Sequence, residues 1–129
     1  MLRLPTALYV RLFRWLFARR FLRFGQGSKL IFPAGVDGAQ RIAIGDDVFV
    51  EYKTYLAAMP HTGMPSCLLE IGSGSRLGRF NHLYATHRVV LGRHVLTANN
   101  VYISDNLHGY QDPRVPILQQ PVVQNGVVE

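Results

Sequence analysis

Aliphatic side chains recur at every sixth position from residue 42 onward. Three runs start with an aliphatic residue and a glycine, at Ile44-Gly45, Ile71-Gly72 and Leu91-Gly92. Each run has three steps of six residues, and the steps open at Ile44, Val50 and Leu56, at Ile71, Leu77 and Leu83, and at Leu91, Thr97 and Ile103. Such a period is typical of short strands that meet at tight corners, with one side chain per strand stacked inside a coil. The pattern predicts a mainly β fold of about three coils of parallel strands.

The intervals between these runs predict loops. The interval from Ile44 to Ile71 is much longer than three such steps, which places a loop near 57–67, where proline and glycine are frequent. The interval from Ile71 to Leu91 is only slightly longer than three steps, so a short insertion falls near His87 and Arg88.

A long irregular segment, residues 104–126, follows the third coil. Three prolines stiffen it, and long ordered loops on a rigid scaffold often carry function. The last residues, NGVVE (125–129), resemble the lead-ins before Ile71 and Leu91, so we expect a fourth coil to begin there. The chain is then either truncated before that coil or completed by another chain, because an open parallel edge needs to be covered.

Residues 1–24 carry the whole net charge of +6. They contain six arginines and no acidic residue, whereas basic and acidic residues balance in the rest of the chain. A neutral body offers no basic surface for nucleic acid. A helix is expected after Pro5, but no apolar run approaches the roughly 20 residues of a membrane span. The division predicts a helical segment at 1–24, which either lies on an anionic membrane or caps the core, and a β domain at 25–129.

Cys67 is the only cysteine, so no intrachain disulfide can form, which fits a reducing compartment such as the cytoplasm. No base lies near Cys67 in the sequence, and we do not expect it to act as a nucleophile. The expected location is the cytoplasm, with residues 1–24 as a candidate contact to the inner face of the membrane.

Two stretches carry a more specific pattern, GRFNHL (78–83) and VLTANNVYISDNLHGY (95–110). Together with the six-residue repeat, they resemble the hexapeptide-repeat acyltransferases, in particular the O-acetyltransferases encoded with capsule, exopolysaccharide and lipopolysaccharide assembly genes. The corresponding turn in that family has Asp, then Asn or His, any residue, His and Gly, and residues 105–109 match it. The resemblance covers about residues 25–129 and implies a left-handed parallel β-helix. The C-terminal coils of the family are absent here.

The resemblance also implies a reaction. Its members transfer an acetyl group from acetyl-CoA to a sugar hydroxyl of a surface polysaccharide or its lipid-linked precursor, usually as homotrimers, and no metal is expected. The histidine of the turn is the general base, which is His108 in this chain. A neutral imidazole suits that role, because a sugar hydroxyl is a poor nucleophile near neutral pH until its proton is removed.

Other residues near this turn are candidates for supporting roles. Asp105 either orients the ring of His108 or caps the turn. Asn106 holds the turn or contacts the acceptor, and Tyr110 is a further candidate for binding it. Asn81 and His82 match a Phe-Asn/Cys-His stretch of the family, and they either line the acceptor side of the cleft or form a corner.

Two alternatives remain open at this point. The spacing of His82 and His87 equals that of two metal ligands that γ-class carbonic anhydrases, which are also left-handed β-helices, supply across subunits, and His61 or His108 would be the third ligand. The chain can also be a non-catalytic scaffold. In the resembling enzymes the C-terminal coils supply much of the acyl-CoA groove, so a shortened chain can fold and still bind the donor poorly.

Overall fold

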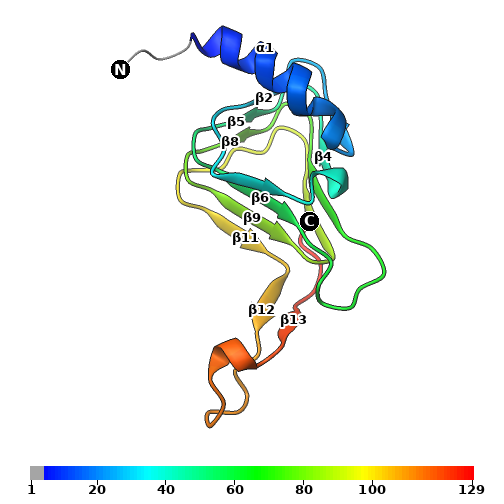
Figure 1. The fold of residues 1–129 in the computed structure, drawn as a ribbon, viewed down its shortest axis with the longest axis vertical. Helices are drawn as coiled ribbons and strands as arrows, with labels where there is room; N and C mark the ends of the chain where they lie inside the picture. The colour runs from blue at the N-terminus through cyan, green and yellow to red at the C-terminus, as the bar shows by residue number, and fades with distance from the viewer. Residues whose placement is uncertain (1–4) are drawn as a thin grey trace.

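The computed structural model describes residues 5–129 and is mainly β, with an α-helix at its N-terminal end (Figure 1). Helix α1 covers Thr6–Phe17 and continues into a 3-10 turn, η1 (Ala18–Arg20). The helix is shorter than the predicted 1–24 segment because extended backbone already begins at Arg23, and residues 1–4 of that segment lie outside the described part. Within residues 5–129, no helix has the length and apolar character needed to cross a membrane.

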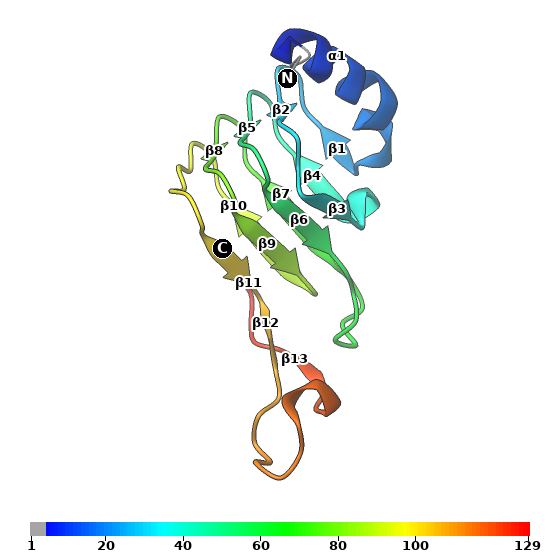
Figure 2. The ribbon, with the colours of Figure 1, turned by 60° about the vertical axis from the view of Figure 1, so that its left-hand side comes forward.

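Three parallel sheets form the body of the protein. The first contains β1 (Arg23–Phe24), β4 (Ile42–Ile44), β7 (Leu68–Ile71) and β10 (Arg88–Leu91), in that order. The second contains β2 (Lys29–Leu30), β5 (Phe49–Val50) and β8 (Arg76–Leu77). The third contains β3 (Gly35–Asp37), β6 (Tyr55–Ala58), β9 (His82–Ala85) and β11 (Tyr102–Ser104). In the first three circuits of the chain, consecutive strands enter the three sheets in turn, whereas the fourth circuit meets the second sheet only through an isolated bridge between Leu96 and Arg76. We call these four circuits coils 1 to 4 (residues 23–37, 42–58, 68–85 and 88–104; Figure 2).

The structure therefore has four coils, where the sequence predicted about three. The additional coil is the first, in which Phe24, Leu30 and Val36 follow the same six-residue spacing and pair in register with strands of coil 2. The aliphatic-glycine pattern does not predict this coil because it opens with Phe24-Gly25, an aromatic residue where the other coils have an aliphatic one. The predicted loop near 57–67 is confirmed, since residues 59–67 lie between β6 and β7.

Each coil turns at three corners. The corners between the first and second sheets and between the second and third sheets follow the six-residue step, whereas the third corner, between the third sheet and the first sheet of the next coil, is longer. Phe24 pairs with Ile44, and Ile71 pairs with Leu91, so the repeat from coil 1 to coil 2 has the same length as the repeat from coil 3 to coil 4. The short insertion near His87 is thus not an isolated feature. It belongs to the third corner, which coil 1 builds with the 3-10 turn η2 (Ala39–Arg41).

The interior is a set of stacked aliphatic layers. Ile71, Leu77 and Leu83 are at most 1% exposed, as the repeat predicted, and each lies in register with its counterparts in the neighbouring coils. Burial of such side chains supplies about 1.5–3 kcal/mol each. The core is therefore continuous from coil 1 to coil 4.

Close packing between coils explains the glycine that follows the opening residue of coils 1, 2 and 3. A side chain at Gly72 would overlap the backbone carbonyl of Gly92, and one at Gly25 would overlap that of Gly45. Gly92 has no atom within 4 Å of its would-be side chain, because coil 4 is the last complete coil. The aliphatic-glycine pattern thus records how closely the coils stack.

The two ends of the coil stack are covered differently. Helix α1 lies across coil 1, where Phe13 packs against the core, and this confirms that the helix caps one open end (Figure 1). At the other end residues 105–124 form a projection, which we call the arm; it contains the antiparallel pair β12 (Asn106–His108) and β13 (Val122–Gln124) with η3 (Ile117–Gln119) between them. After the arm the chain rejoins the first sheet, where Val128 forms a parallel bridge with Val89, as the lead-in pattern predicted.

Candidate functional site

The arm presents His108 to solvent. Its backbone lies in β12 and pairs with Val122 of β13, and its side chain is exposed. Among residues 5–129, no group forms a hydrogen bond with the imidazole ring. The next residue, Gly109, is buried and donates its N–H to the carbonyl of Pro121 at 2.9 Å. A side chain at Gly109 would come within 3.2 Å of that same oxygen, so glycine allows the two strands of the arm to approach each other.

Asp105 fastens the root of the arm to the turn at residues 86–88, between coils 3 and 4. This residue is 1% exposed. One carboxylate oxygen, Oδ1, accepts hydrogen bonds from the backbone N–H and the hydroxyl of Thr86 at 2.8 and 2.9 Å. The other, Oδ2, accepts from the backbone N–H groups of His87 and Arg88 at 2.8 and 2.7 Å. The carbonyl of Asp105 also accepts from the N–H of Asn125, so this residue holds both ends of the arm.

These contacts decide between the two roles predicted for Asp105. Its carboxylate satisfies the turn at 86–88 and forms no hydrogen bond with His108, so the expectation that it orients the imidazole directly is wrong. Burial alone would raise the pKa of this carboxyl group, but the hydrogen bonds from Thr86, His87 and Asn106 together hold the pKa below its usual value. Asp105 is therefore an ionised anchor.

Asn106 takes part in the same anchor. Its side-chain amide donates to the carbonyl of Tyr84 at 3.4 Å and to Oδ1 of Asp105 at 3.2 Å, while its backbone N–H donates to the hydroxyl of Ser104 at 3.1 Å. Of its two predicted roles, holding the turn is the one for which the structure provides contacts. Tyr110, by contrast, is 67% exposed, and its ring is free to meet a ligand next to His108.

Asn81 is placed differently from the prediction. It is 1% exposed, its amide donates to the hydroxyl of Thr97 at the corner of coil 4, and its Oδ1 accepts from the N–H of Val101 at 2.9 Å. A group that is buried and satisfied in this way cannot line an acceptor cleft. The corner role is confirmed, and the acceptor-binding role predicted for Asn81 is wrong.

His82 lies in a row of rings on the outer face of the third sheet. It pairs in register with Tyr55 of β6 and Tyr102 of β11, and its ring centroid is 4.7 Å from that of Tyr55 and 5.1 Å from that of Tyr102. Partial burial between these rings lowers the pKa of His82, so the imidazole is neutral near pH 7. This face leads directly to the arm, because β11 is followed by β12 after one residue.

Two further polar groups border this row. The hydroxyl of Tyr55 donates to the carboxylate of Asp37, and this interaction raises the pKa of Tyr55 to about 12. The hydroxyl of Tyr84 lies 3.4 Å from Nδ1 of His61, which stands in the loop after β6. The sequence pattern alone does not point to Tyr55 and Tyr84. The row becomes visible once the coils are aligned, since Tyr55, His82 and Tyr102 occupy the same position in successive coils.

The histidines proposed as metal ligands do not gather at one point. Within residues 5–129, no group of three or more His, Cys, Asp or Glu side chains is arranged to hold a metal ion. His82 is enclosed by tyrosines, and Nδ1 of His87 lies 3.1 Å from the carbonyl of Ser66. The ligand set required by the carbonic-anhydrase alternative is therefore not assembled in one chain.

Cys67 is also unsuited to catalysis. Its thiol donates to the carbonyl of Ala85 at 3.3 Å. Burial, together with the nearby charge of Asp105, raises the pKa of this thiol to about 11, so it carries almost no thiolate near neutral pH. This agrees with the prediction that Cys67 is not a nucleophile.

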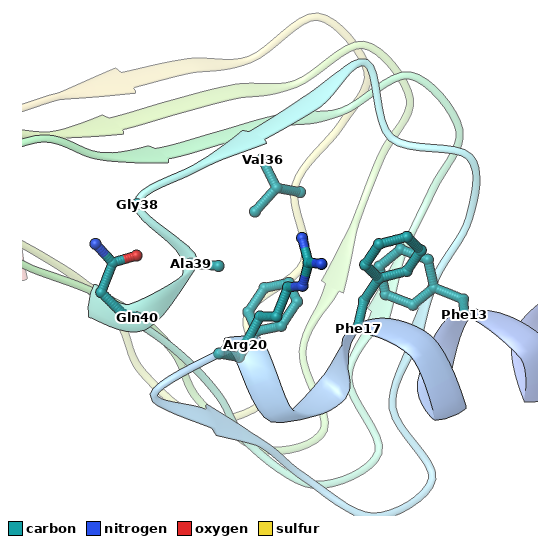
Figure 3. A pocket seen from close by; sticks show the side chains of 8 residues that line it. Phe13, Phe17, Arg20, Val36, Gly38, Ala39 and Gln40 are labelled. Carbon is teal, nitrogen blue, oxygen red and sulfur yellow. The ribbon is translucent and has the colours of Figure 1, made fainter.

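Two hollows lie away from the arm. The larger, about 560 Å³, is enclosed between α1 and the end of coil 1, with Phe13, Phe17 and Val36 on its walls and Arg20 beside them (Figure 3). The smaller, about 390 Å³, lies along the first sheet and is lined by both acidic and basic residues, including Asp46 and Arg93. Neither includes a residue of the arm.

Comparisons of this chain with protein-family models, with curated proteins and with solved structures find no match.

Proposed function

We propose that the protein is a left-handed parallel β-helix of the hexapeptide-repeat type that transfers an acetyl group from acetyl-CoA to a sugar hydroxyl, with His108 as the general base. One observation carries the proposal more than any other. His108 is an exposed imidazole on a projecting arm, and a buried carboxylate fixes the root of that arm to a rigid stack of coils.

The proposed reaction needs one proton acceptor and no protein nucleophile. The neutral imidazole of His108 removes the proton from the sugar hydroxyl while the sugar oxygen attacks the thioester carbonyl carbon of acetyl-CoA. The new C–O bond forms as the C–S bond breaks. The sulfur of CoA leaves as a thiolate and takes up the proton that the imidazolium then releases. The products are the acetylated sugar, free CoA and His108 in its original neutral form.

The remaining parts of the site receive roles that follow from their contacts. Asp105 and Asn106 are positioning residues, because their hydrogen bonds hold the arm and none of those within residues 5–129 reaches the imidazole of His108. Tyr110 and Tyr102 are exposed, and together with His82 they offer flat faces on which a sugar ring can lie. A sugar acceptor on this surface, either a surface polysaccharide or its lipid-linked precursor, fits the family resemblance of the turn.

The donor site and the assembly follow from the same proposal. The arm extends away from the coils of its own chain (Figure 2), so the acyl donor needs a second wall opposite His108. A homotrimer in the cytoplasm, in which a neighbouring copy supplies that wall, is the arrangement that the resemblance implies. Sedimentation equilibrium tests this part, and a monomer at all concentrations would contradict it.

Titration calorimetry with CoA separates an enzyme from a non-catalytic scaffold. The enzyme proposal predicts saturable binding of CoA to the full chain, with stoichiometry of one per subunit. A protein that is folded by circular dichroism and releases no heat of binding with either CoA or acetyl-CoA would support the scaffold instead.

A transfer assay tests the role of His108. Full-length protein is incubated with acetyl-CoA and a panel of hexoses and N-acetylhexosamines, and released CoA and acetylated sugar are both measured. His108→Ala is expected to lower the rate about 10²-fold or more, which is the size of effect a general base produces. The matched control is His94→Asn, which changes another exposed histidine and retains a residue that tolerates its positive φ of 57°. Equal rates for wild type and His108→Ala would overturn the assignment.

A further inference from the structure

Helix α1 has a second apolar face that is not part of the core formed by residues 5–129. Tyr9 and Phe13 point toward coil 1, where Phe13 packs against the core and the hydroxyl of Tyr9 accepts a hydrogen bond from the N–H of Phe32. The opposite face exposes a row of large apolar side chains with the spacing of one helical stripe: Leu8 (50% exposed), Leu12 (46%), Trp15 (78%) and Leu16 (45%). We call these four residues the outer stripe. A helix that only caps a core needs one apolar face, so the outer stripe requires another explanation.

The charge around the outer stripe has a single sign. Residues 5–36 contain arginines and one lysine, and the first acidic residue of the chain is Asp37. Arg14 and Arg23 are engaged with the protein, through the carbonyl of Gly25 and the carboxylate of Asp46 respectively. Arg11 and Arg19 are exposed, and neither forms an ion pair or a side-chain hydrogen bond within residues 5–129. Positive charge is therefore available at the edge and at the C-terminal end of the stripe.

We propose that the outer stripe of α1 binds the surface of an anionic lipid bilayer. Leucine and tryptophan side chains enter the boundary between headgroups and acyl chains, and arginines beside them bind lipid phosphates. With 12 residues, the helix is about 18 Å long, which suits a helix that lies in the plane of the interface rather than across it. A second copy of the chain is a poor occupant, because face-to-face contact would bring Arg11 and Arg19 against like charges.

The position of α1 sets the orientation of the protein on the membrane. The helix covers coil 1, while the arm with His108 leaves from coil 4 at the opposite end (Figures 1 and 2). Neighbouring strands are about 4.8 Å apart, so three intervals separate the two end coils by about 14 Å. If the proposed function holds, the acceptor sugar is one held away from the bilayer surface, as in a lipid-linked oligosaccharide, and not the sugar nearest the phosphate.

Trp15 is the only tryptophan, so the intrinsic tryptophan fluorescence of the protein reports directly on the surroundings of the outer stripe. Full-length protein is mixed with vesicles of phosphatidylcholine and phosphatidylglycerol, which are anionic, and with vesicles of phosphatidylcholine alone. We expect a blue shift of Trp15 fluorescence and flotation of the protein with the anionic vesicles, and quenching by lipids brominated on the acyl chain. Salt should weaken the binding, because the arginine contacts are screened.

Substitutions on the exposed face test the proposal without removing the cap on the core. Leu8→Glu with Leu12→Glu is expected to abolish flotation. Arg11→Gln and Arg19→Gln are each expected to weaken vesicle partitioning about fivefold, in line with the contribution of one arginine near an anionic surface. Leu118→Glu, which changes an 88% exposed leucine in the arm, is the matched control and should bind as wild type does.

Two outcomes would overturn the proposal. In the first, the spectrum of Trp15 is the same with and without anionic vesicles while circular dichroism shows a folded protein. In the second, Trp15 shifts with protein concentration in the absence of lipid, which would assign the stripe to a contact between copies. Neither readout depends on acetyl transfer, so failure of this proposal and failure of the proposed enzymatic function can be told apart.

Discussion

The coils hold together through stacked aliphatic layers, whereas the arm is attached to them mainly by one buried carboxylate. Ile71 and Leu83 are fully buried and repeat in register from coil to coil. In the arm, Ile117 is 55% exposed and Leu118 is 88% exposed, and the fastening is made by the hydrogen bonds of Asp105. The coils therefore provide the stability of the protein, and the proposed chemistry is placed in a separate region, the arm. The arm can present His108 because it does not have to build the core.

The largest loss of stability is expected from the coil interior. Leu83→Ala should lower the free energy of unfolding by about 2–5 kcal/mol, because it leaves a cavity in a layer that cannot collapse without shifting the neighbouring coils. Urea denaturation followed by circular dichroism measures the change. Leu118→Ala in the arm is the control, with an expected change within about 0.5 kcal/mol. Similar losses for both variants would contradict the division between coils and arm.

The second largest loss of stability is expected from substitution of Asp105, the residue that anchors the arm. Asp105→Asn replaces one carboxylate oxygen with a donor and leaves buried N–H groups of residues 86–88 without an acceptor, at a cost of about 2–4 kcal/mol. Asp112→Asn changes an exposed carboxylate that pairs with Arg114, and it should lower stability far less than Asp105→Asn because solvent screens an ion pair at the surface. The measurement is again urea denaturation, at pH 7.

The contribution of Asp105 to the free energy of unfolding should decrease as the pH is lowered. Because the pKa of its carboxyl is lower in the folded protein than in the unfolded chain, its ionised form stabilises the fold above the unfolded value. This contribution is lost as the pH falls below about 4 and through the folded pKa. The stability difference between wild type and Asp105→Asn should therefore narrow in acid. A difference that widens below pH 4 would show that the carboxylate is not stabilised by these hydrogen bonds.

A smaller loss of stability is expected when a side chain is introduced between two coils at Gly72. Gly92, at the same position of coil 4, provides the control. Gly72→Ala forces a side chain against the backbone of Gly92 and should cost about 1–3 kcal/mol. Gly92→Ala meets nothing within 4 Å and should change stability by less than about 1 kcal/mol. Equal destabilisation by the two substitutions would indicate that something covers coil 4 as closely as coil 4 covers coil 3.

The repeat made much of the coil predictable from the sequence. The six-residue period identified Ile71, Leu77 and Leu83 as interior residues because only one side chain per short strand can point inward. Coil 1 was missed because Phe24 replaces the aliphatic residue that opens the other coils. The third corner is longer than the six-residue step, and spacing alone could not separate a regular long corner from an insertion.

The candidate site was less predictable, because a polar residue in a turn can serve either the turn or a ligand. The sequence identified His108 and its exposed arm, but it could not show that Asp105 and Asn81 form hydrogen bonds with backbone N–H groups and threonine hydroxyls of neighbouring segments. Those partners lie 16 to 20 residues away in sequence. They become neighbours only after the coils stack, so their roles depend on the register and not on the local motif.

The most direct test of the central claim combines the stability and the activity of one variant. His108→Ala removes an exposed ring with no hydrogen-bond partner within residues 5–129, so its free energy of unfolding should stay within about 0.5 kcal/mol of wild type. Its acetyl transfer rate should fall about 10²-fold or more, and added imidazole should restore part of that rate by replacing the missing base. A variant that is as stable as wild type and equally active without imidazole would contradict the account.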